Sequence, residues 1–190
     1  MPKPFEINEQ PLSYIDRLET RECRSIDLVV MHCTELPDLA TAREYGERVQ
    51  DSARGTGFSG HVYVDRDGVS YRYVPLDRTA HHTRGYNARS VGIELVNRGR
   101  FPDWFDSRRQ VMTEPYPAKQ IEGLMCLLRA LKSELPNLEF IAGHEDLDRG
   151  KVGSSDAPGI EVFRKRDPGP LFPWSAVLAA SDLERMYEWE

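Results

Sequence analysis

Short apolar runs alternate with polar segments along most of the chain. The run at 28–31 is continuous, lies between polar residues and ends in His32, which is typical of a central strand covered on both faces. We therefore predict a strand over 26–32. The same pattern predicts four more strands, over 61–64, 69–74, 90–96 and 138–142. The second and third of these five strands flank Asp67-Gly68, a strong turn signal, and should form an antiparallel hairpin.

Helical periodicity marks three other segments. The clearest covers 117–135, where apolar residues recur every three or four positions between Pro117 and Pro136. Its apolar stripe consists of Ile121, Leu124, Met125, Leu128, Leu131 and Leu135. Segment 39–53 is rich in good helix formers, and a short last helix is predicted over 174–187.

The predicted order of elements, β-α-β-β-β-α-β-α, indicates an α/β fold. We expect a single domain with a central mixed β-sheet of about five strands flanked by helices, which suits a chain of 190 residues. Residues 1–25 are polar and contain several prolines, so they should form an N-terminal arm packed on the main domain, residues 26–190. Two long segments, about 97–116 and 148–163, are expected to be inserted loops.

The composition limits the partners of the protein. Charged residues make up 29% of the chain and apolar residues 39%, as in soluble globular proteins. A formal net charge of −6 argues against nucleic acid as the main partner. The longest apolar runs are only a few residues, so no membrane interaction is expected.

The cysteines and the N-terminal segment indicate a compartment. Cys23, Cys33 and Cys126 are odd in number and far apart, so they form neither a disulfide framework nor a CxxC metal motif. The first residues lack the apolar core of a secretory signal. A reducing, cytoplasmic location is therefore expected. Export without a recognisable signal peptide is the alternative.

Two histidines and an aspartate are the candidate metal ligands. His32 ends the first predicted strand, and His144 follows the last one, at positions where a sheet opens to a cleft. Asp167 precedes Pro168 in a stiff proline-rich turn. Two imidazoles and one carboxylate leave the fourth position of a tetrahedral zinc site free for water. The sequence therefore predicts a Zn²⁺ site in a cleft at the strand ends.

A hydrolytic zinc site also needs a proton acceptor and a group that stabilises an oxyanion. Glu94 lies in the middle of the strand over 90–96, where a carboxylate is costly to bury unless it is paired or used. It is the candidate acceptor. Lys165, two residues before Asp167, is the candidate oxyanion partner, so these residues together predict a zinc hydrolase.

Six stretches in order along the chain carry a resemblance to a known family. They are Val30-Met-His-Cys-Thr34, Gly60-His-Val-Tyr-Val-Asp-Arg-Asp-Gly68, Ala80-His-His-Thr-Arg-Gly-Tyr-Asn87, Ser90-Val-Gly-Ile-Glu-Leu95, Ala142-Gly-His144 and Asp167-Pro-Gly-Pro-Leu-Phe-Pro-Trp174. With them the chain resembles the zinc-dependent N-acetylmuramoyl-L-alanine amidases, a group that includes phage lysozyme-amidases, wall-recycling amidases and peptidoglycan-recognition proteins. One motif would be weak, whereas six in order are highly specific.

The resemblance implies hydrolysis of the amide between the lactyl group of N-acetylmuramic acid and L-alanine of peptidoglycan stem peptides. It implies peptidoglycan fragments (muropeptides) as partners, and it gives the metal-ligand and catalytic roles to the same five residues. It also places His82 and Asn87 in the substrate groove. For His61 it leaves a substrate role and a packing role equally open.

The chain departs from the family pattern at two places. Gly60 stands where many relatives carry tyrosine, and Asp167 follows His144 by 23 residues, about twice the common spacing. The extra residues bring a rival ligand, because Asp156-Ala-Pro-Gly159 imitates Asp167-Pro-Gly-Pro170. Lys165 before Asp167, and the apolar residues after it, favour Asp167 over Asp156.

Two other functions remain open at this point. A relative that binds muropeptides without cutting them typically lacks a metal ligand, whereas this chain keeps all three candidates. A zinc peptidase acting within the stem peptide would use the same site, but the motifs favour the muramyl amide. With a cytoplasmic location, soluble muropeptides are the expected substrate rather than the polymeric wall.

Overall fold

The computed structural model describes residues 6–187, and its central element is strand β2 (Leu28–Cys33), all six residues of which are buried. Within the described residues the main sheet has seven strands in the order β1-β4-β3-β5-β2-β6-β9. The other strands are β1 (Ile7–Glu9), β3 (Val62–Val64), β4 (Ser70–Arg72), β5 (Ser90–Leu95), β6 (Phe140–Gly143) and β9 (Glu184–Arg185). β5 and β6 run parallel to β2, whereas β3 and β4 form the predicted antiparallel hairpin, so the sheet is mixed as predicted.

All five predicted strands are present, and two further strands lie at the edges of the sheet. β1 pairs in parallel with β4, and β9 pairs in parallel with β6. Both are short, and their residues are half-buried or exposed. Such edge strands carry no buried apolar alternation, which is why the expected number of about five strands was too low.

Between residues 6 and 187 the α-helices are α1 (Leu39–Glu47), α2 (Ala118–Glu134), α3 (His144–Leu147) and α4 (Trp174–Ser181). The same part of the chain has three short 3₁₀ helices, η1 (Ile15–Arg17), η2 (Cys23–Ser25) and η3 (Asn87–Arg89). Two predicted helices were too long. The segment after α1 turns back on itself through a bridge between Asp51 and Thr56. After α4, Asp182 takes a left-handed conformation with φ 52°, and the chain then continues as β9.

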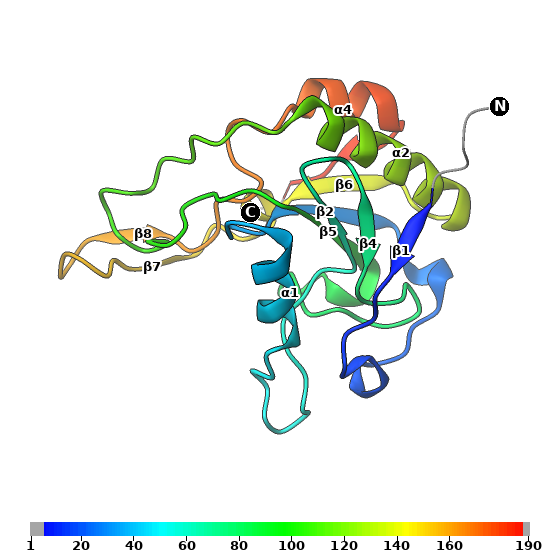
Figure 1. Ribbon diagram of the computed structural model, residues 1–190, viewed down its shortest axis with the longest axis horizontal. Coiled ribbons are helices and arrows are strands. Elements are labelled where there is room, and N and C mark those ends of the chain that lie inside the picture. The colour runs from blue at the N-terminus through cyan, green and yellow to red at the C-terminus, as the bar shows by residue number, and fades with distance from the viewer. Residues whose placement is uncertain (1–5, 188–190) are drawn as a thin grey trace.

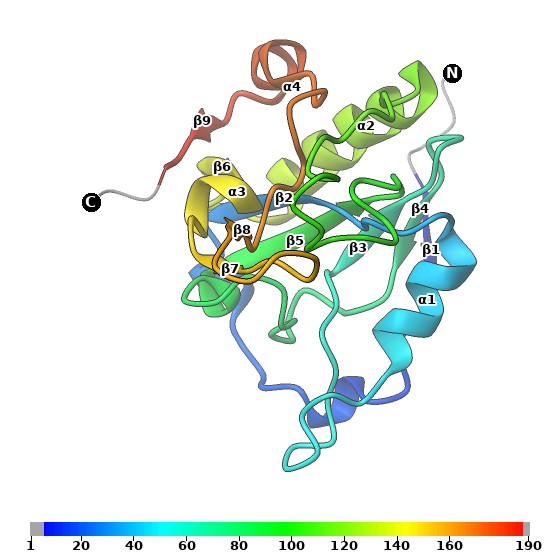
Figure 2. The ribbon, with the colours of Figure 1, turned by 90° about the vertical axis from the view of Figure 1, so that its left-hand side faces the viewer.

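The main core lies between the sheet and α2, with α4 beside α2 on the same side and α1 on the other (Figures 1 and 2). Val29 and Met31 of β2 pack there with Leu124 and Leu128 of α2. Because side chains alternate along a strand, the residues between them point to the opposite face of the sheet. In the part of the chain that the structure describes, no helix has both the length and the apolar character required to cross a membrane.

Residues 6–25 of the expected N-terminal arm lie against the domain, whereas residues 1–5 and 188–190 are outside the described residues. Leu12, Tyr14 and Leu18 are buried in a second apolar cluster with Tyr63 and Tyr73. This packing adds the strand β1 and the helix η1 to the fold.

The two segments expected as inserted loops lie side by side. Segment 97–116 is irregular, but 148–163 contains an antiparallel hairpin of β7 (Lys151–Gly153) and β8 (Glu161–Phe163). Figure 1 shows both projecting from the same end of the molecule. A hydrogen bond of 2.9 Å from Ser155 N to Phe105 O joins them.

Candidate active site

His32 and Glu94 are neighbours on two adjacent strands. In the parallel register of β2 and β5, His32 pairs with Glu94. The residues beside them in each strand pack against α2, so these two side chains project from the opposite face of the sheet. There both line a cavity of about 560 Å³. The strand register therefore places a candidate metal ligand and a candidate acid–base group in one cleft.

His144 and Asp167 reach this cleft from the other side of β2. His144 is the first residue of α3 and follows β6, in which Gly143 pairs with Met31 of β2. Glu145 N donates a hydrogen bond of 2.9 Å to Asp167 O, and Tyr116 Oη donates one of 2.6 Å to Pro168 O. These contacts fix the segment that carries the carboxylate beside α3.

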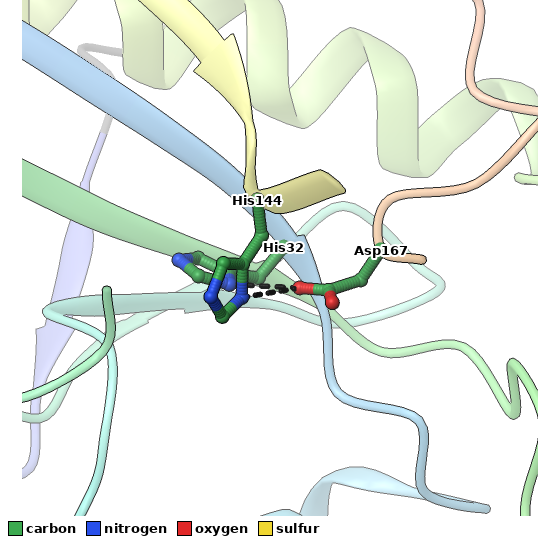
Figure 3. A group of neighbouring side chains, drawn as sticks. All are labelled: His32, His144 and Asp167. Atoms are coloured by element: carbon green, nitrogen blue, oxygen red, sulfur yellow. Dashed lines mark hydrogen bonds and ion pairs between the residues drawn. The ribbon is translucent and has the colours of Figure 1, made fainter. Parts of the chain in front are cut away.

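The three candidate ligands converge on one point, as Figure 3 shows. Asp167 Oδ2 lies 2.8 Å from His32 Nδ1 and 3.1 Å from His144 Nδ1. All three side chains are buried, and their donor atoms lie within 4.8 Å of one another. The other carboxylate oxygen, Asp167 Oδ1, is buried and has no hydrogen-bond partner. A buried oxygen of this kind is costly unless a further group binds it.

The charges in the cluster suit a metal ion. Burial and the adjacent His144 lower the pKa of His32 to about 4, so its ring is neutral at pH 7, as a metal ligand requires. Burial raises the pKa of Asp167, but the two imidazoles outweigh it and hold this pKa well below its ordinary value. Two imidazoles and a carboxylate are a donor set that zinc accepts. The residues present therefore fit a zinc ion.

Asp156, the rival ligand, lies elsewhere. Its carboxylate accepts hydrogen bonds of 2.7 Å from Ser107 N and 2.9 Å from Ser107 Oγ. It thus connects the hairpin β7–β8 to segment 97–116. The structure brings Asp167 to the two histidines, although Asp156 is closer to them in sequence.

Glu94 and Lys165 complete the cleft. Burial, and then the charge of Asp167, raise the pKa of Glu94 to about 8, while Lys165 acts in the opposite direction. Lys165 also lines the cavity that contains Glu94. A carboxyl group with a pKa near neutrality can both accept and release a proton, which is what general acid–base catalysis requires.

The sequence matches the family model described as N-acetylmuramoyl-L-alanine amidase over residues 22–170. The chain belongs to the N-acetylmuramoyl-L-alanine amidase family. The match includes all five residues of the cleft discussed above, and it confirms the resemblance seen in the sequence.

Several amidases of known sequence or structure are similar to the chain. It is 32% identical to the 1,6-anhydro-N-acetylmuramyl-L-alanine amidase AmpD of Enterobacter cloacae over 126 residues, which are 62% of this chain and 54% of AmpD. The chain spans about half the length of the curated relatives it matches.

Two solved structures show the same fold. The endolysin amidase LysCS from Clostridium intestinale URNW has a TM-score of 0.64 at 21% identity, covering 97% of this chain and 98% of LysCS. The amidase AmiD from E. coli has a TM-score of 0.59 at 25% identity, covering 84% of this chain and 58% of AmiD. The AmiD structure is a complex with the substrate anhydro-N-acetylmuramic acid-L-Ala-D-gamma-Glu-L-Lys.

In this amidase-family chain, the residues expected to bind substrate lie in three different environments. His82 lines the cleft and a second cavity of about 1190 Å³, with Nδ1 3.0 Å from His32 Nε2. Asn87 lines the larger cavity, but its Oδ1 accepts hydrogen bonds of 3.0 Å from His82 N and 2.7 Å from Thr83 N. The Asn87 amide oxygen therefore holds the backbone of this segment.

His61 is fully buried, and its ring centroid lies 5.5 Å from that of His82. Gly92 N lies 3.0 Å from His61 Nδ1, and His61 Nε2 is 3.1 Å from Arg78 O. These backbone contacts favour the packing role over the substrate role.

Sequence reasoning missed two residues at the site. Tyr63 lines the cleft and pairs in register with Glu94. Its hydroxyl oxygen lies 3.1 Å from Ser59 Oγ. The alternation of the strand over 61–64 could have indicated it. Arg21 lies in the N-terminal arm and donates to Leu76 O and Ser90 O at 2.8 and 2.7 Å. A lone arginine in a polar segment gives no such signal.

Proposed function

We propose that the protein is a zinc-dependent amidase that hydrolyses the bond between the lactyl group of N-acetylmuramic acid and L-alanine. The observation that supports this most directly is the buried convergence of His32, His144 and Asp167, with Asp167 Oδ1 unpartnered. A Zn²⁺ ion held by these residues would polarise the scissile carbonyl and lower the pKa of water. Membership of the amidase family supports the choice of bond.

Glu94 is proposed as the acid–base group. It projects into the same cleft as His32, so its carboxylate can take a proton from the attacking water and return it to the leaving amine. The pKa of about 8 for Glu94 results from burial and from the charges of the protein itself. A nearby cation lowers this pKa, because positive charge favours the carboxylate form that accepts the proton.

Lys165 is proposed to stabilise the oxyanion. Lys165 lines both cavities. It directly follows Arg164, whose carbonyl accepts a hydrogen bond of 3.2 Å from the buried Arg100. A positive charge held at the edge of a cleft stabilises negative charge that develops on the substrate carbonyl oxygen.

Soluble muropeptides are the proposed substrates. The cavities of about 560 and 1190 Å³ share His82, His144 and Lys165 in their walls, so a sugar and a peptide can extend to either side of the metal site. AmpD, a relative by sequence, is described as an amidase of 1,6-anhydro-N-acetylmuramyl-L-alanine, and AmiD holds an anhydromuramyl tripeptide. Both support an anhydromuropeptide substrate.

Product analysis tests the proposal. Zinc-loaded protein is incubated with an anhydromuramyl peptide and, separately, with intact sacculi, and the products are identified by mass spectrometry. The expected products are the free anhydromuramyl sugar and a peptide that begins with L-alanine. Cleavage inside the peptide would identify a peptidase, and tight binding without cleavage would identify a recognition protein. Faster cleavage of sacculi would contradict the choice of soluble substrates.

A cytoplasmic location is proposed together with that substrate. Cys23, Cys33 and Cys126 are all free thiols, which suits a reducing compartment. Fractionation of cells that produce the native protein tests this. Recovery in the periplasm or the medium would contradict it.

A further inference from the structure

A directed series of hydrogen bonds ends at the metal ligand His32. It begins at Tyr86 O, a backbone carbonyl that can only accept. Ser90 Oγ lies 2.7 Å from it, so the single hydroxyl hydrogen of Ser90 is directed at Tyr86 O. Ser90 Oγ is then left with its lone pairs for any other neighbour.

His82 is that neighbour, with Nε2 3.2 Å from Ser90 Oγ. Because the hydroxyl hydrogen is already used, Ser90 Oγ accepts and His82 Nε2 carries the hydrogen. A neutral imidazole has a single N–H, and in His82 the contact with Ser90 Oγ uses it. His82 Nδ1 is therefore a bare acceptor.

The bare Nδ1 of His82 lies 3.0 Å from His32 Nε2. The contact forms a hydrogen bond when His32 Nε2 carries the hydrogen. In a neutral imidazole this leaves His32 Nδ1 with its lone pair free, and Nδ1 is the atom that faces Asp167 Oδ2. The hydrogen bonds that run from Tyr86 O through Ser90 and His82 thus leave His32 Nδ1 free to bind a metal ion.

The His82 ring is held in position by its surroundings. A Cβ at position 92 would lie only 2.6 Å from His82 Cγ, so the ring needs the glycine in β5. The backbone of the segment is fixed by Asn87, as described above. Thr83 Oγ1 lies 3.0 Å from the bare His82 Nδ1, to which its hydroxyl can donate, and 3.3 Å from His32 Nε2, whose hydrogen it can accept.

We propose that Ser90 and His82 are positioning residues that fix His32 in the tautomer whose Nδ1 binds the metal. This inference rests on the proposed function, because it assumes that the His32, His144 and Asp167 site binds zinc. Asp167 Oδ2 alone, as an acceptor 2.8 Å from His32 Nδ1, favours the other tautomer. The bonds from Tyr86 through Ser90 and His82 oppose that preference.

Zinc affinity measured by chelator competition gives the first test. Ser90→Ala removes the acceptor for His82 Nε2, and the zinc dissociation constant should rise on the order of 10–100-fold, the usual effect of losing a group that orients a ligand. Ser70→Ala is the matched control, since Ser70 is equally buried in β4 but its Oγ has no partner. An unchanged zinc affinity in folded Ser90→Ala would overturn the proposal. So would a larger loss in Thr83→Val, because Thr83 would then be the partner that matters.

The second test needs no variant. In zinc-loaded, ¹⁵N-labelled protein, imidazole ¹⁵N shifts report which ring nitrogen carries hydrogen. His82 should show a protonated Nε2 and a bare Nδ1. The opposite tautomer would overturn the assignment. These readouts are independent of turnover: zinc-binding wild type that leaves muropeptides intact would refute the amidase function and not this inference.

Discussion

Gly60 leaves the space that the Glu94 side chain occupies. A Cβ at position 60 would lie 2.7 Å from Glu94 Cγ and 3.1 Å from Gly92 O. The glycine at this position therefore sets how the side chain of the catalytic candidate Glu94 packs. The phenol that lies beside Glu94 here is Tyr63, on the same strand face of the cleft.

Gly60→Ala is expected to displace the Glu94 carboxylate and lower kcat. Misplacing a reacting group by about 1 Å costs on the order of 10²-fold in rate. Gly153→Ala is the control, since a Cβ there meets nothing within 4 Å. Steady-state kinetics of both variants, with circular dichroism to verify folding, test this. Equal kcat for Gly60→Ala and wild type would show that Glu94 tolerates the shift or is not used.

Asp167→Ala should greatly weaken zinc binding and abolish activity, because it removes the carboxylate on which both histidines converge. Asp156→Ala should leave zinc binding and activity nearly unchanged, because Asp156 contacts Ser107 instead. Zinc titration of the two variants measures the difference. Tight zinc binding by Asp167→Ala would contradict the ligand assignment.

Removal of zinc from the wild type with a chelator should abolish turnover, and added zinc should restore it.

Glu94→Gln should retain zinc and the fold but lose its acid–base function. The expected decrease in kcat is roughly 10²–10⁴-fold, the usual contribution of such a group. Metal analysis accompanies the kinetics. If the variant loses zinc, Glu94 supports the metal site; if it turns over at the wild-type rate, another group moves the proton.

The buried Glu94 should also make the stability of the metal-free protein depend on pH. The folded state keeps the proton up to a pKa of about 8, whereas the unfolded chain releases it near the ordinary 4.5. The unfolded state therefore binds fewer protons between these values, and the free energy of unfolding falls as pH rises, by on the order of 5 kcal/mol at most. Glu94→Gln lacks this contribution. Urea unfolding of both metal-free proteins at pH 5 and pH 8 should show the variant gaining relative stability at pH 8, and a constant difference would contradict the burial of a titrating Glu94.

Arg100 is expected to stabilise the backbone segment that leads to Lys165. Its buried guanidinium bonds Glu35 through Nε and Nη2 at 2.7 and 2.8 Å, and Nη1 donates to Phe163 O at 2.9 Å. Arg100→Met leaves the buried Glu35 carboxylate unpaired and should lower the free energy of unfolding by about 3–5 kcal/mol. Arg109→Met, in the same segment but with a side chain 67% exposed, should change it by less than about 1 kcal/mol.

Denaturant unfolding measures both arginine variants. Adding Glu35→Gln to Arg100→Met should recover part of the lost stability, because the buried charge is removed. No recovery in the double variant would indicate that the bonds to the 163–164 backbone, and not the ion pair, are decisive.

The elements that depend on local pattern could be predicted from the sequence. β2 and β5 are continuous or alternating apolar runs, and α2 has an unbroken helical stripe, so neighbouring residues suffice to define them. The ligand candidates could also be identified, because histidines directly after apolar strands and an aspartate before a proline are local features. The edge strands β1 and β9 were missed because backbone pairing to another strand, rather than their own residues, forms them.

Only the tertiary structure decided which of these residues meet. The register of β2 on β5 places His32 beside Glu94, and a shift by one residue would have put Glu94 on the α2 side of the sheet. The return of the chain after β8 brings Asp167 to the histidines and leaves Asp156 on Ser107. The direction of bonding from Tyr86 O through Ser90 and His82 likewise exists only in three dimensions. Sequence alone determined the residue types and the strands, because those follow from local chemistry; long-range packing determined the pairings, because each depends on residues far apart in the chain.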